Sequence, residues 1–96
     1  MPTWTKLRGF MDDYTKLPPT QRAAFRLTVG HFVSDIKSGS FWNGLRIKKL
    51  QGHDDIWEMT WAADGRATFT YGAPVRDGEP HVIWRRIGTH DVLKRP

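Results

Sequence analysis

Apolar residues in the first part of the chain recur at intervals of three and four, the period of an amphipathic helix. This pattern predicts one helix over about residues 4–17 and a second over about residues 19–37, with Gly39 following as a C-terminal cap. Pro18 and Pro19 separate them, because proline is tolerated in a first turn but not in a helix interior. The two helices are expected to form an antiparallel hairpin. Their apolar stripes, expected in the core, are Trp4, Leu7, Phe10, Met11, Tyr14 and Leu17, then Phe25, Val29, Phe32, Val33 and Ile36.

Further along the chain, apolar and polar residues alternate, which is the period of a half-buried strand. Asp64 and Gly65 form a tight-turn signal between two of these segments. Consecutive strands with short connections favour an antiparallel meander, and the helix hairpin must cover one face, since a sheet needs a partner layer. The expected fold is α+β, a helix hairpin on a four-stranded antiparallel sheet in a single domain of residues 1–96. The predicted strands are about 45–49, 56–61, 66–71 and 81–87, and the tail after them leaves little room for a further helix.

Alternation assigns the strand residues to the two faces of the sheet. The face covered by the helices is predicted to hold Trp57, Met59, Trp61, Ala67, Phe69 and Tyr71. The other face, left free, is predicted to carry Glu58, Thr60, Arg66, Thr68, Thr70 and Arg86, with His90 just past the last strand. Within that last strand, one parity is shared by Val82, Trp84 and Arg86 and the other by Ile83, Arg85 and Ile87. A bulge in any strand would exchange the faces beyond it.

Composition narrows the function classes. The 96 residues are 39% hydrophobic and 12% aromatic, ample for one core, and they include no cysteine, which excludes disulfides and thiolate metal sites. Lys and Arg number 15 against 10 acidic residues, and the net charge of +5 favours a polyanionic partner, either a nucleic acid or an acidic protein. No apolar run is long enough to span a membrane, and the first residues lack the apolar core of a signal peptide. We expect a cytoplasmic protein with no membrane partner.

Specific cofactor signatures are absent from the sequence. It contains no H-E-x-x-H or similar metal spacing, no phosphate-cradling glycine loop and no nucleophile-elbow serine, so no metal or cofactor is expected. What remains is two arginines, a histidine and a carboxylate: Arg66, Arg86, His90 and Glu58. Guanidinium groups bind phosphate and stabilise charge that develops at phosphorus. A histidine moves a proton near neutral pH, and a carboxylate acts as a base or holds the histidine. This set suffices to cleave RNA by attack of a 2′-hydroxyl on the adjacent phosphate.

Each candidate also has a purely structural interpretation, and residue types alone do not decide between the two. Arg66 follows a turn, where an exposed polar residue is expected, and Glu58 can pair with a cross-strand arginine. Arg85 can lie at the edge of the core with its guanidinium in solvent. Lys48 and Lys49 can be plain charges of an edge strand.

Several segments, taken in order, resemble the RelE/ParE-type toxins of bacterial toxin–antitoxin systems, and RelE-like members most. After the helix hairpin with its proline corner, these segments are residues 44–48, 57–59, 65–69 and 83–91, which extend the resemblance over nearly the whole chain. The resemblance implies two helices packed on an antiparallel sheet. It also implies a toxin that a cognate antitoxin protein wraps and blocks. Since such complexes often repress their own operon, operator DNA is expected as a partner only through the antitoxin.

RelE-type members enter the ribosomal A site and cut mRNA without a metal. On this resemblance Arg66 matches the arginine that contacts the scissile phosphate, Arg86 matches the arginine of the last strand, and His90 matches the basic residue just beyond Gly88. Several ribonuclease members carry a catalytic Tyr or His near the C-terminus, and the tail of residues 92–96 has neither. The residues expected to bind RNA are Arg46, Lys48, Lys49 and Arg85.

The function that the resemblance implies is a type II toxin that cleaves mRNA on the ribosome and thereby inhibits translation. Two alternatives stay open. ParE-type members inhibit DNA gyrase without enzymatic activity and lack this basic, proton-transferring set. A basic interaction domain without toxicity would also satisfy the charge of the chain.

Overall fold

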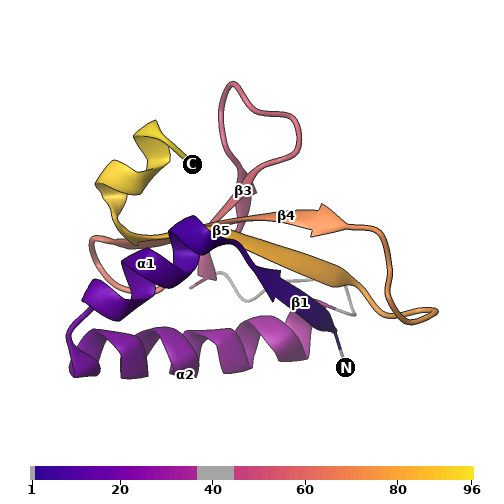
Figure 1. Ribbon diagram of the computed structural model, residues 1–96, viewed down its shortest axis with the longest axis horizontal. Helices are drawn as coiled ribbons and strands as arrows, with labels where there is room; N and C mark the ends of the chain where they lie inside the picture. The colour runs from indigo at the N-terminus through magenta and orange to yellow at the C-terminus, as the bar shows by residue number, and fades with distance from the viewer. Residues whose placement is uncertain (1, 37–44) are drawn as a thin grey trace.

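A layer of helices and a mixed sheet make up the protein, whose computed structural model describes residues 2–36 and 45–96 (Figure 1). The helices in these residues are α1 (Arg8–Lys16), α2 (Pro19–Ile36) and a 3-10 helix, η2 (His90–Lys94). The strands are β1 (Thr3–Lys6), β2 (Lys48–Lys49), β3 (Trp57–Thr60), β4 (Gly65–Gly72) and β5 (His81–Thr89), in the spatial order β1-β5-β4-β3-β2. The predicted α+β class is confirmed, and the sheet has five strands rather than four.

The helix hairpin turns at its proline pair, as the sequence predicts. Leu17, which precedes Pro18, adopts an extended conformation with ψ of 138°, because the proline ring disfavours a helical residue before it. Pro19 then occupies the first position of α2, where the missing N–H costs nothing. The predicted second helix is confirmed as far as Ile36. Its last residue, 37, and the predicted cap Gly39 lie outside the described residues.

The start of the first helix is wrong in the prediction. Residues 3–6 form β1, which pairs parallel with the beginning of β5, and α1 begins only at Arg8. Both ring nitrogens of His81 meet threonine hydroxyls of β1, Nδ1 at 2.7 Å from Thr3 and Nε2 at 3.0 Å from Thr5. The apolar spacing fitted a helix, but a Thr-Trp-Thr segment beside an unpaired strand edge also suits a β-strand, and the tertiary partner decided the outcome.

Two other boundaries differ from the prediction. The strand expected over residues 45–49 is reduced to Lys48–Lys49, since Arg46 has a φ of 50°, a left-handed conformation that an extended strand excludes. The tail expected to lack a helix forms η2, whose first turn is capped by the Thr89 hydroxyl accepting from the Asp91 N–H. β5 runs two residues beyond the predicted 87, up to Thr89 itself.

One extra residue in β5 changes which side chains share a face. In the antiparallel pair of β4 and β5, Thr68 lies opposite Arg86 and Phe69 lies opposite Trp84, so Arg85 is a bulge. The prediction that Trp84 and Arg86 share a face is therefore wrong. Val82, Trp84 and Ile87 all turn toward the helices, and all are buried.

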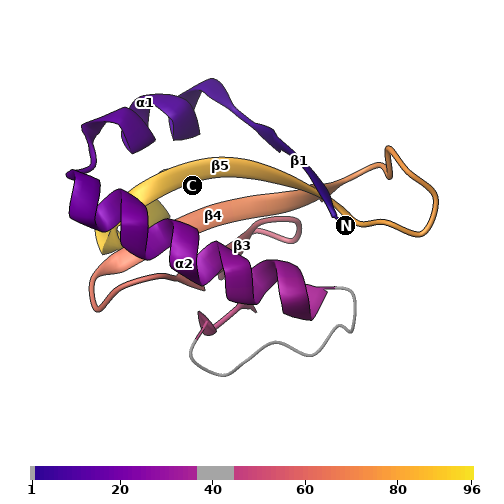
Figure 2. The ribbon, with the colours of Figure 1, turned by 90° about the horizontal axis from the view of Figure 1, so that it is seen from below.

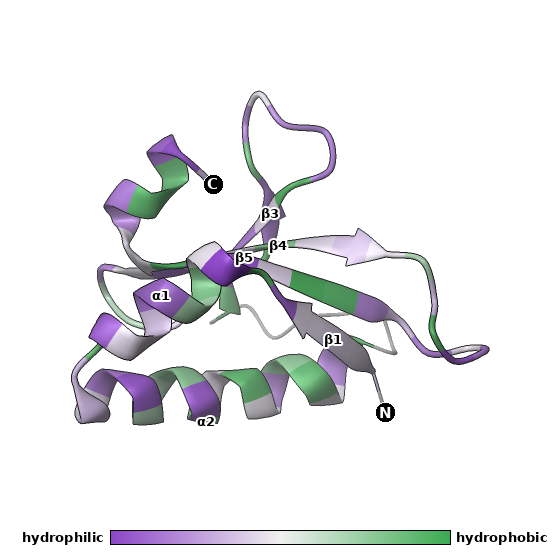
Figure 3. Ribbon diagram, in the orientation of Figure 1, coloured by the Kyte–Doolittle hydropathy of each residue, from purple (hydrophilic) through white to green (hydrophobic). Residues whose placement is uncertain are grey.

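The core is an aromatic cluster between α2 and the sheet, centred on Trp84. Its ring lies 5.5 Å from those of Phe25 and Phe32, 5.4 Å from that of Phe69 and 5.9 Å from that of Phe10, measured between centroids. α2 crosses the sheet diagonally while α1 runs beside β5 (Figure 2). Hydrophobic and hydrophilic residues are interspersed along α2 (Figure 3), and the helix buries Phe25, Phe32 and Ile36.

Gly65 allows the turn between β3 and β4 to close over Trp61. A Cβ added at Gly65 would lie 2.6 Å from Cε2 of the Trp61 ring, so Gly65→Ala is expected to destabilise the fold by about 1–3 kcal/mol through overpacking. Gly30→Ala in α2 is the matched control, because no described atom lies within 4 Å of its added Cβ; it should stabilise by about 0.5–1 kcal/mol. Urea unfolding of both variants measures the difference, and equal stabilities would contradict this packing.

Candidate functional site

A row of polar residues crosses four strands on the side of the sheet that faces away from α2. Lys48, Glu58, Thr68 and Arg86 lie directly opposite one another in register from β2 to β5. Directly opposed residues of antiparallel strands point to the same face, so these four side chains form one line. The Lys48 ammonium lies 3.9 Å from the Glu58 carboxylate. We call this line the polar row.

The middle of this face is not free, contrary to the expectation. Glu58 is only 6% exposed and Thr68 is fully buried. η2 lies on the same side of the sheet, opposite α2 (Figure 1). There Val92 packs so closely on Gly88 that an added Cβ would meet its methyl group at 2.9 Å. The accessible part of the face therefore lies at the ends of the polar row and around the start of η2.

Arg66 and His90 lie at the same end of the β4–β5 pair. Arg66 pairs with Gly88 and Gly65 pairs with Thr89, so His90 follows directly after the last paired residue of β5. His90 is exposed at the start of η2. The Arg66 guanidinium folds back on the preceding turn and donates through Nη1 to the Gly65 carbonyl at 3.0 Å, with longer contacts to two other turn carbonyls. Arg66 near the start of β4 and His90 at the start of η2 thus lie at the same end of the β4–β5 pair.

Arg86 is engaged by a residue that the sequence reasoning missed. Its Nε donates to Asp13 Oδ2 at 2.6 Å and its Nη2 donates to Asp13 Oδ1 at 3.1 Å, while Nη1 donates to the Arg95 carbonyl at 3.2 Å. The hydrogen bond to Asp13 raises the pKa of the Arg86 guanidinium, against the opposing effect of partial burial. Asp13 stands 73 residues earlier, in a helix with several charged residues, and no local pattern distinguishes it.

The four residues expected to bind RNA do not share one surface. Lys48 belongs to the polar row, but Lys49 pairs with Trp57 on the opposite face, where its Nζ lies 5.6 Å from the indole centroid. Arg85 is the bulge residue, and its Nε is buried with no hydrogen-bond partner among the described residues. Arg46 is exposed and outside any strand.

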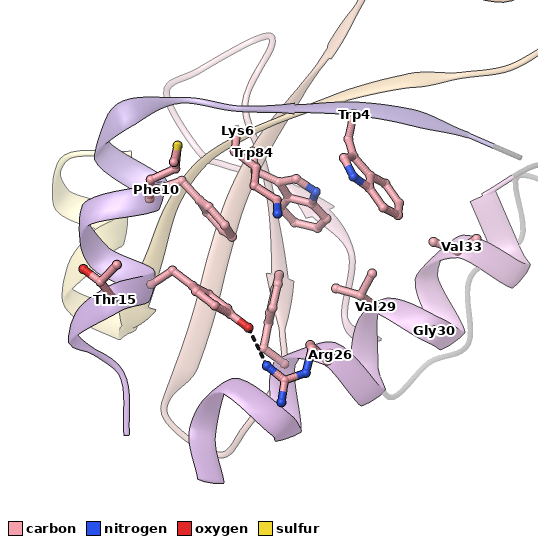
Figure 4. Close-up of a pocket in the computed structure, with 12 residues that line it drawn as sticks. Trp4, Lys6, Phe10, Thr15, Arg26, Val29, Gly30, Val33 and Trp84 are labelled. Carbon is pink, nitrogen blue, oxygen red and sulfur yellow. Dashed lines mark hydrogen bonds between the residues drawn. The ribbon is translucent and has the colours of Figure 1, made fainter. Parts of the chain in front are cut away.

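A second feature is an apolar groove between the two helices of the hairpin, which we call the α1–α2 groove (Figure 4). It encloses about 590 Å³. Trp4 and Met11, both expected in the core, instead line this groove and are 41% and 54% exposed. Arg26 closes one part of it by donating to the Tyr14 hydroxyl at 2.9 Å. The remaining lining residues are Lys6, Phe10, Thr15, Phe25, Val29, Gly30, Val33 and Trp84.

Two further observations concern residues 2–36 and 45–96 only. They contain no cluster of three or more His, Cys, Asp or Glu side chains able to hold a metal ion. No helix among them is long and apolar enough to cross a membrane.

Comparison with solved structures identifies the fold. A RelB–RelE antitoxin–toxin complex from Methanococcus jannaschii aligns with a TM-score of 0.60 at 18% identity, covering 94% of each chain. A YoeB/ParE toxin from Agrobacterium tumefaciens aligns with a TM-score of 0.66 at 13% identity, covering 92% of this chain and 98% of the other. The chain has the fold of the RelE-type toxins.

The same fold recurs in the E. coli DinJ–YafQ complex, which aligns with a TM-score of 0.64 at 12% identity over 97% of this chain and 98% of the other. No protein-family model and no curated protein matches the sequence. The resemblance inferred from the sequence is thus confirmed as a shared RelE-type fold.

The buried hydroxyl of Thr68 gives a test of the polar row. Its Oγ1 has no hydrogen-bond partner among the described residues, and such a group carries a desolvation cost. Thr68→Val keeps the shape, so the variant should be as stable as the original or more stable by up to about 2 kcal/mol in urea unfolding. A loss of more than about 1 kcal/mol, the usual net value of a hydrogen bond, would mean that the hydroxyl has a partner.

Proposed function

We propose that this protein is the toxin of a type II toxin–antitoxin system and that it cleaves mRNA on the ribosome, which inhibits translation. The observation that carries the proposal is that Arg66, near the start of β4, and His90, directly after β5, lie at the same end of the β4–β5 pair, beside the polar row. The RelE-type fold supports it, since the solved structures that share this fold include toxins in complex with antitoxins. The net charge of +5 agrees with a polyanionic substrate.

The proposed chemistry needs no group beyond the chain's own side chains. The 2′-hydroxyl of the nucleotide attacks the adjacent phosphorus and the bond to the 5′-oxygen of the next nucleotide breaks, leaving a cyclic phosphate. Two proton transfers accompany this step, because the 2′-hydroxyl loses its proton to a base and the departing 5′-oxygen gains one from an acid. His90, exposed at the start of η2, carries out one of the two transfers, and Glu58 is the candidate for the other. Arg66 exchanges its weak contacts with the turn carbonyls for the phosphate and stabilises the charge that develops on it.

Glu58 and Arg86 lie on the same face of the sheet, and we propose a different catalytic role for each. Glu58, nearly buried beside Lys48, is proposed as a base or as a group that orients one. A guanidinium carries five N–H groups, and the hydrogen bonds of Arg86 use three of its nitrogens, so two N–H groups remain for a phosphate oxygen. Arg86 thus contributes charge from a fixed position.

Of the basic residues, Lys48 is proposed as the main RNA contact of the sheet, because it lies on the same face as Glu58 and is largely exposed. Arg46, exposed just before β2, is proposed to contact the RNA backbone nearby. Lys49 and Arg85 are proposed to contribute long-range attraction, since one lies over Trp57 and the other is half-buried.

The α1–α2 groove is proposed to bind the cognate antitoxin. Trp4 and Met11 are exposed to water in this apolar groove, and the apolar side chains of a partner helix would cover them. Lys6 and Arg26 at the groove suit acidic residues beside those apolar ones. Operator DNA would then be reached through the antitoxin, and ribosome and mRNA through the opposite face.

Induced expression in bacteria, followed by mapping of mRNA 5′ ends, tests the activity. Cuts in phase with codons inside translated frames are expected from the unaltered protein. His90→Ala and Arg66→Ala should each reduce cleavage about 10²- to 10³-fold, the usual effect of removing a proton-transfer group or a charge-stabilising donor. Intact mRNA together with DNA damage would replace this proposal by gyrase inhibition, and normal growth would replace it by a non-toxic interaction domain.

The groove is tested by two matched substitutions. Met11→Lys places a charge inside the α1–α2 groove, whereas Leu27→Lys places the same charge on α2 at a residue that is 72% exposed and outside the groove. Calorimetric titration with the antitoxin should show an affinity loss of at least about tenfold for Met11→Lys, the scale of a binding hot spot. Leu27→Lys should bind as the original chain does; equal affinities of the two variants would exclude the groove.

A further inference from the structure

The Asp13 carboxylate joins three elements that are far apart in the sequence. Asp13 lies in α1, and it accepts two hydrogen bonds from the Arg86 guanidinium of β5. It also accepts from the Ile87 backbone N–H at 3.1 Å, just past the bulge of β5. Arg86 in turn donates to the Arg95 carbonyl, directly after η2. One carboxylate thus connects α1 to β5 and, through a single guanidinium, to the end of η2.

The geometry of this connection is that of a strong ion pair. Two parallel N–H···O bonds between a guanidinium and a carboxylate fix both distance and orientation, which a single lysine contact does not. The side chain of Asp13 is 15% exposed and that of Arg86 is 34% exposed, so solvent screens the pair only in part. Gly9 lies against the Arg86 stem, where an added Cβ would come within 3.3 Å of its Cδ. α1 therefore contacts both members of the pair, Arg86 along its stem and Asp13 from within the helix.

η2 packs on β4 and β5. Val92 packs on Gly88, and the hydrogen bond from Arg86 to the Arg95 carbonyl holds the far end. The first residue of η2 is His90, the proposed proton-transfer residue. η2 is therefore held at both ends, at His90 by the last paired residue of β5 and at Arg95 by the Arg86 guanidinium.

We propose that Asp13 is a positioning residue for the proposed mRNA cleavage: through Arg86 it seats η2 and so holds His90 at the end of the β4–β5 pair near which Arg66 lies. This inference rests on the proposed function for its effect on catalysis, while its effect on η2 is independent of it. Asp13 does not contact the substrate. It acts on the reaction only through Arg86 and η2.

The Asp13 carboxylate could instead inhibit the protein by occupying Arg86, and the experiment must distinguish this role from positioning. A carboxylate and a phosphate both bind a guanidinium in bidentate fashion, so Asp13 also resembles a phosphate that occupies Arg86. Under that alternative, neutralising Asp13 would release Arg86 and raise activity. The additional bond from the Ile87 N–H favours positioning, because it ties the carboxylate to the bulge of β5 rather than to Arg86 alone.

Asp13→Asn in the full-length chain keeps the size of the side chain and removes its charge. Amide hydrogen exchange by NMR is the first readout, since the Arg95 N–H donates to the Val92 carbonyl within η2. Exchange of this amide should accelerate at least about tenfold in Asp13→Asn, because the ion pair no longer holds in place the Arg86 guanidinium that donates to the Arg95 carbonyl. Asp12→Asn is the matched control: it removes the same charge from an exposed neighbouring position and should leave the exchange unchanged.

Cleavage kinetics on translating ribosomes give the second readout. In Asp13→Asn, kcat should fall between about tenfold and a hundredfold with KM unchanged, as expected when a reacting group is displaced but binding residues are kept. Val92→Ala loosens η2 without touching the ion pair and should reproduce both effects, which keeps the test valid if Asp13→Asn unfolds.

The results of these measurements distinguish a failure of the positioning role of Asp13 from a failure of the proposed function. A kcat that rises in Asp13→Asn, or one that stays constant while η2 remains protected, would overturn the positioning role. If the unaltered protein cleaves no mRNA, the proposed function fails instead, and the exchange of the Arg95 amide alone then decides whether Asp13 seats η2.

Discussion

The bulge at Arg85 is the constraint on which the rest of the structure depends. It allows Trp84 and Ile87, three positions apart, to enter the same core, and it turns Arg86 to the opposite face between them. In a regular strand, Arg86 would share the face of Trp84 and bring a guanidinium toward the aromatic cluster, where an unpaired charge is very unfavourable. Without the bulge, either the core or the polar row would lose its central residue.

The bulge also connects the core to the proposed site. On one side, Trp84 contacts rings from α1, α2 and β4, so that helix hairpin and sheet are held by one side chain. On the other side, Arg86 and the Ile87 N–H both meet Asp13, which brings α1 against the edge of β5. A chain without cysteine has no covalent restraint on this arrangement, and packing and the Asp13–Arg86 pair supply it.

The sequence was sufficient for the features that depend on local patterns. The proline corner, the long helix through Phe25 and Phe32, and the turn at Gly65 all follow from spacing and from residue chemistry. The features that it missed depend on partners far away along the chain. β1 pairs with the edge of β5, where His81 also contacts the hydroxyls of two threonines of β1. Asp13 has its structural role because Arg86, 73 residues later in the chain, donates hydrogen bonds to it.

The placement of the predicted site residues on the sheet follows only in part from the alternation of the sequence. Alternation placed Glu58, Arg66 and Thr68 together correctly, since their two strands pair without interruption. It could not show that η2 would cover part of that face. Nor could it show that the left-handed backbone of Arg46 would shorten the strand predicted over residues 45–49 to β2. Boundaries of this kind are set by tertiary contacts rather than by periodicity.

We propose that mRNA lies on the side of the sheet that faces away from α2. Two neighbouring lysines on opposite faces of the sheet allow the face that contacts mRNA to be determined directly. Lys48 belongs to the polar row, while Lys49 lies over Trp57 on the helix side. A photo-reactive amino acid placed at position 48 or 49 in turn, followed by irradiation on translating ribosomes, reports which face meets the message. mRNA crosslinks are expected from position 48 and none from position 49. Crosslinks from position 49 alone, or equally from both, would contradict this placement of the mRNA.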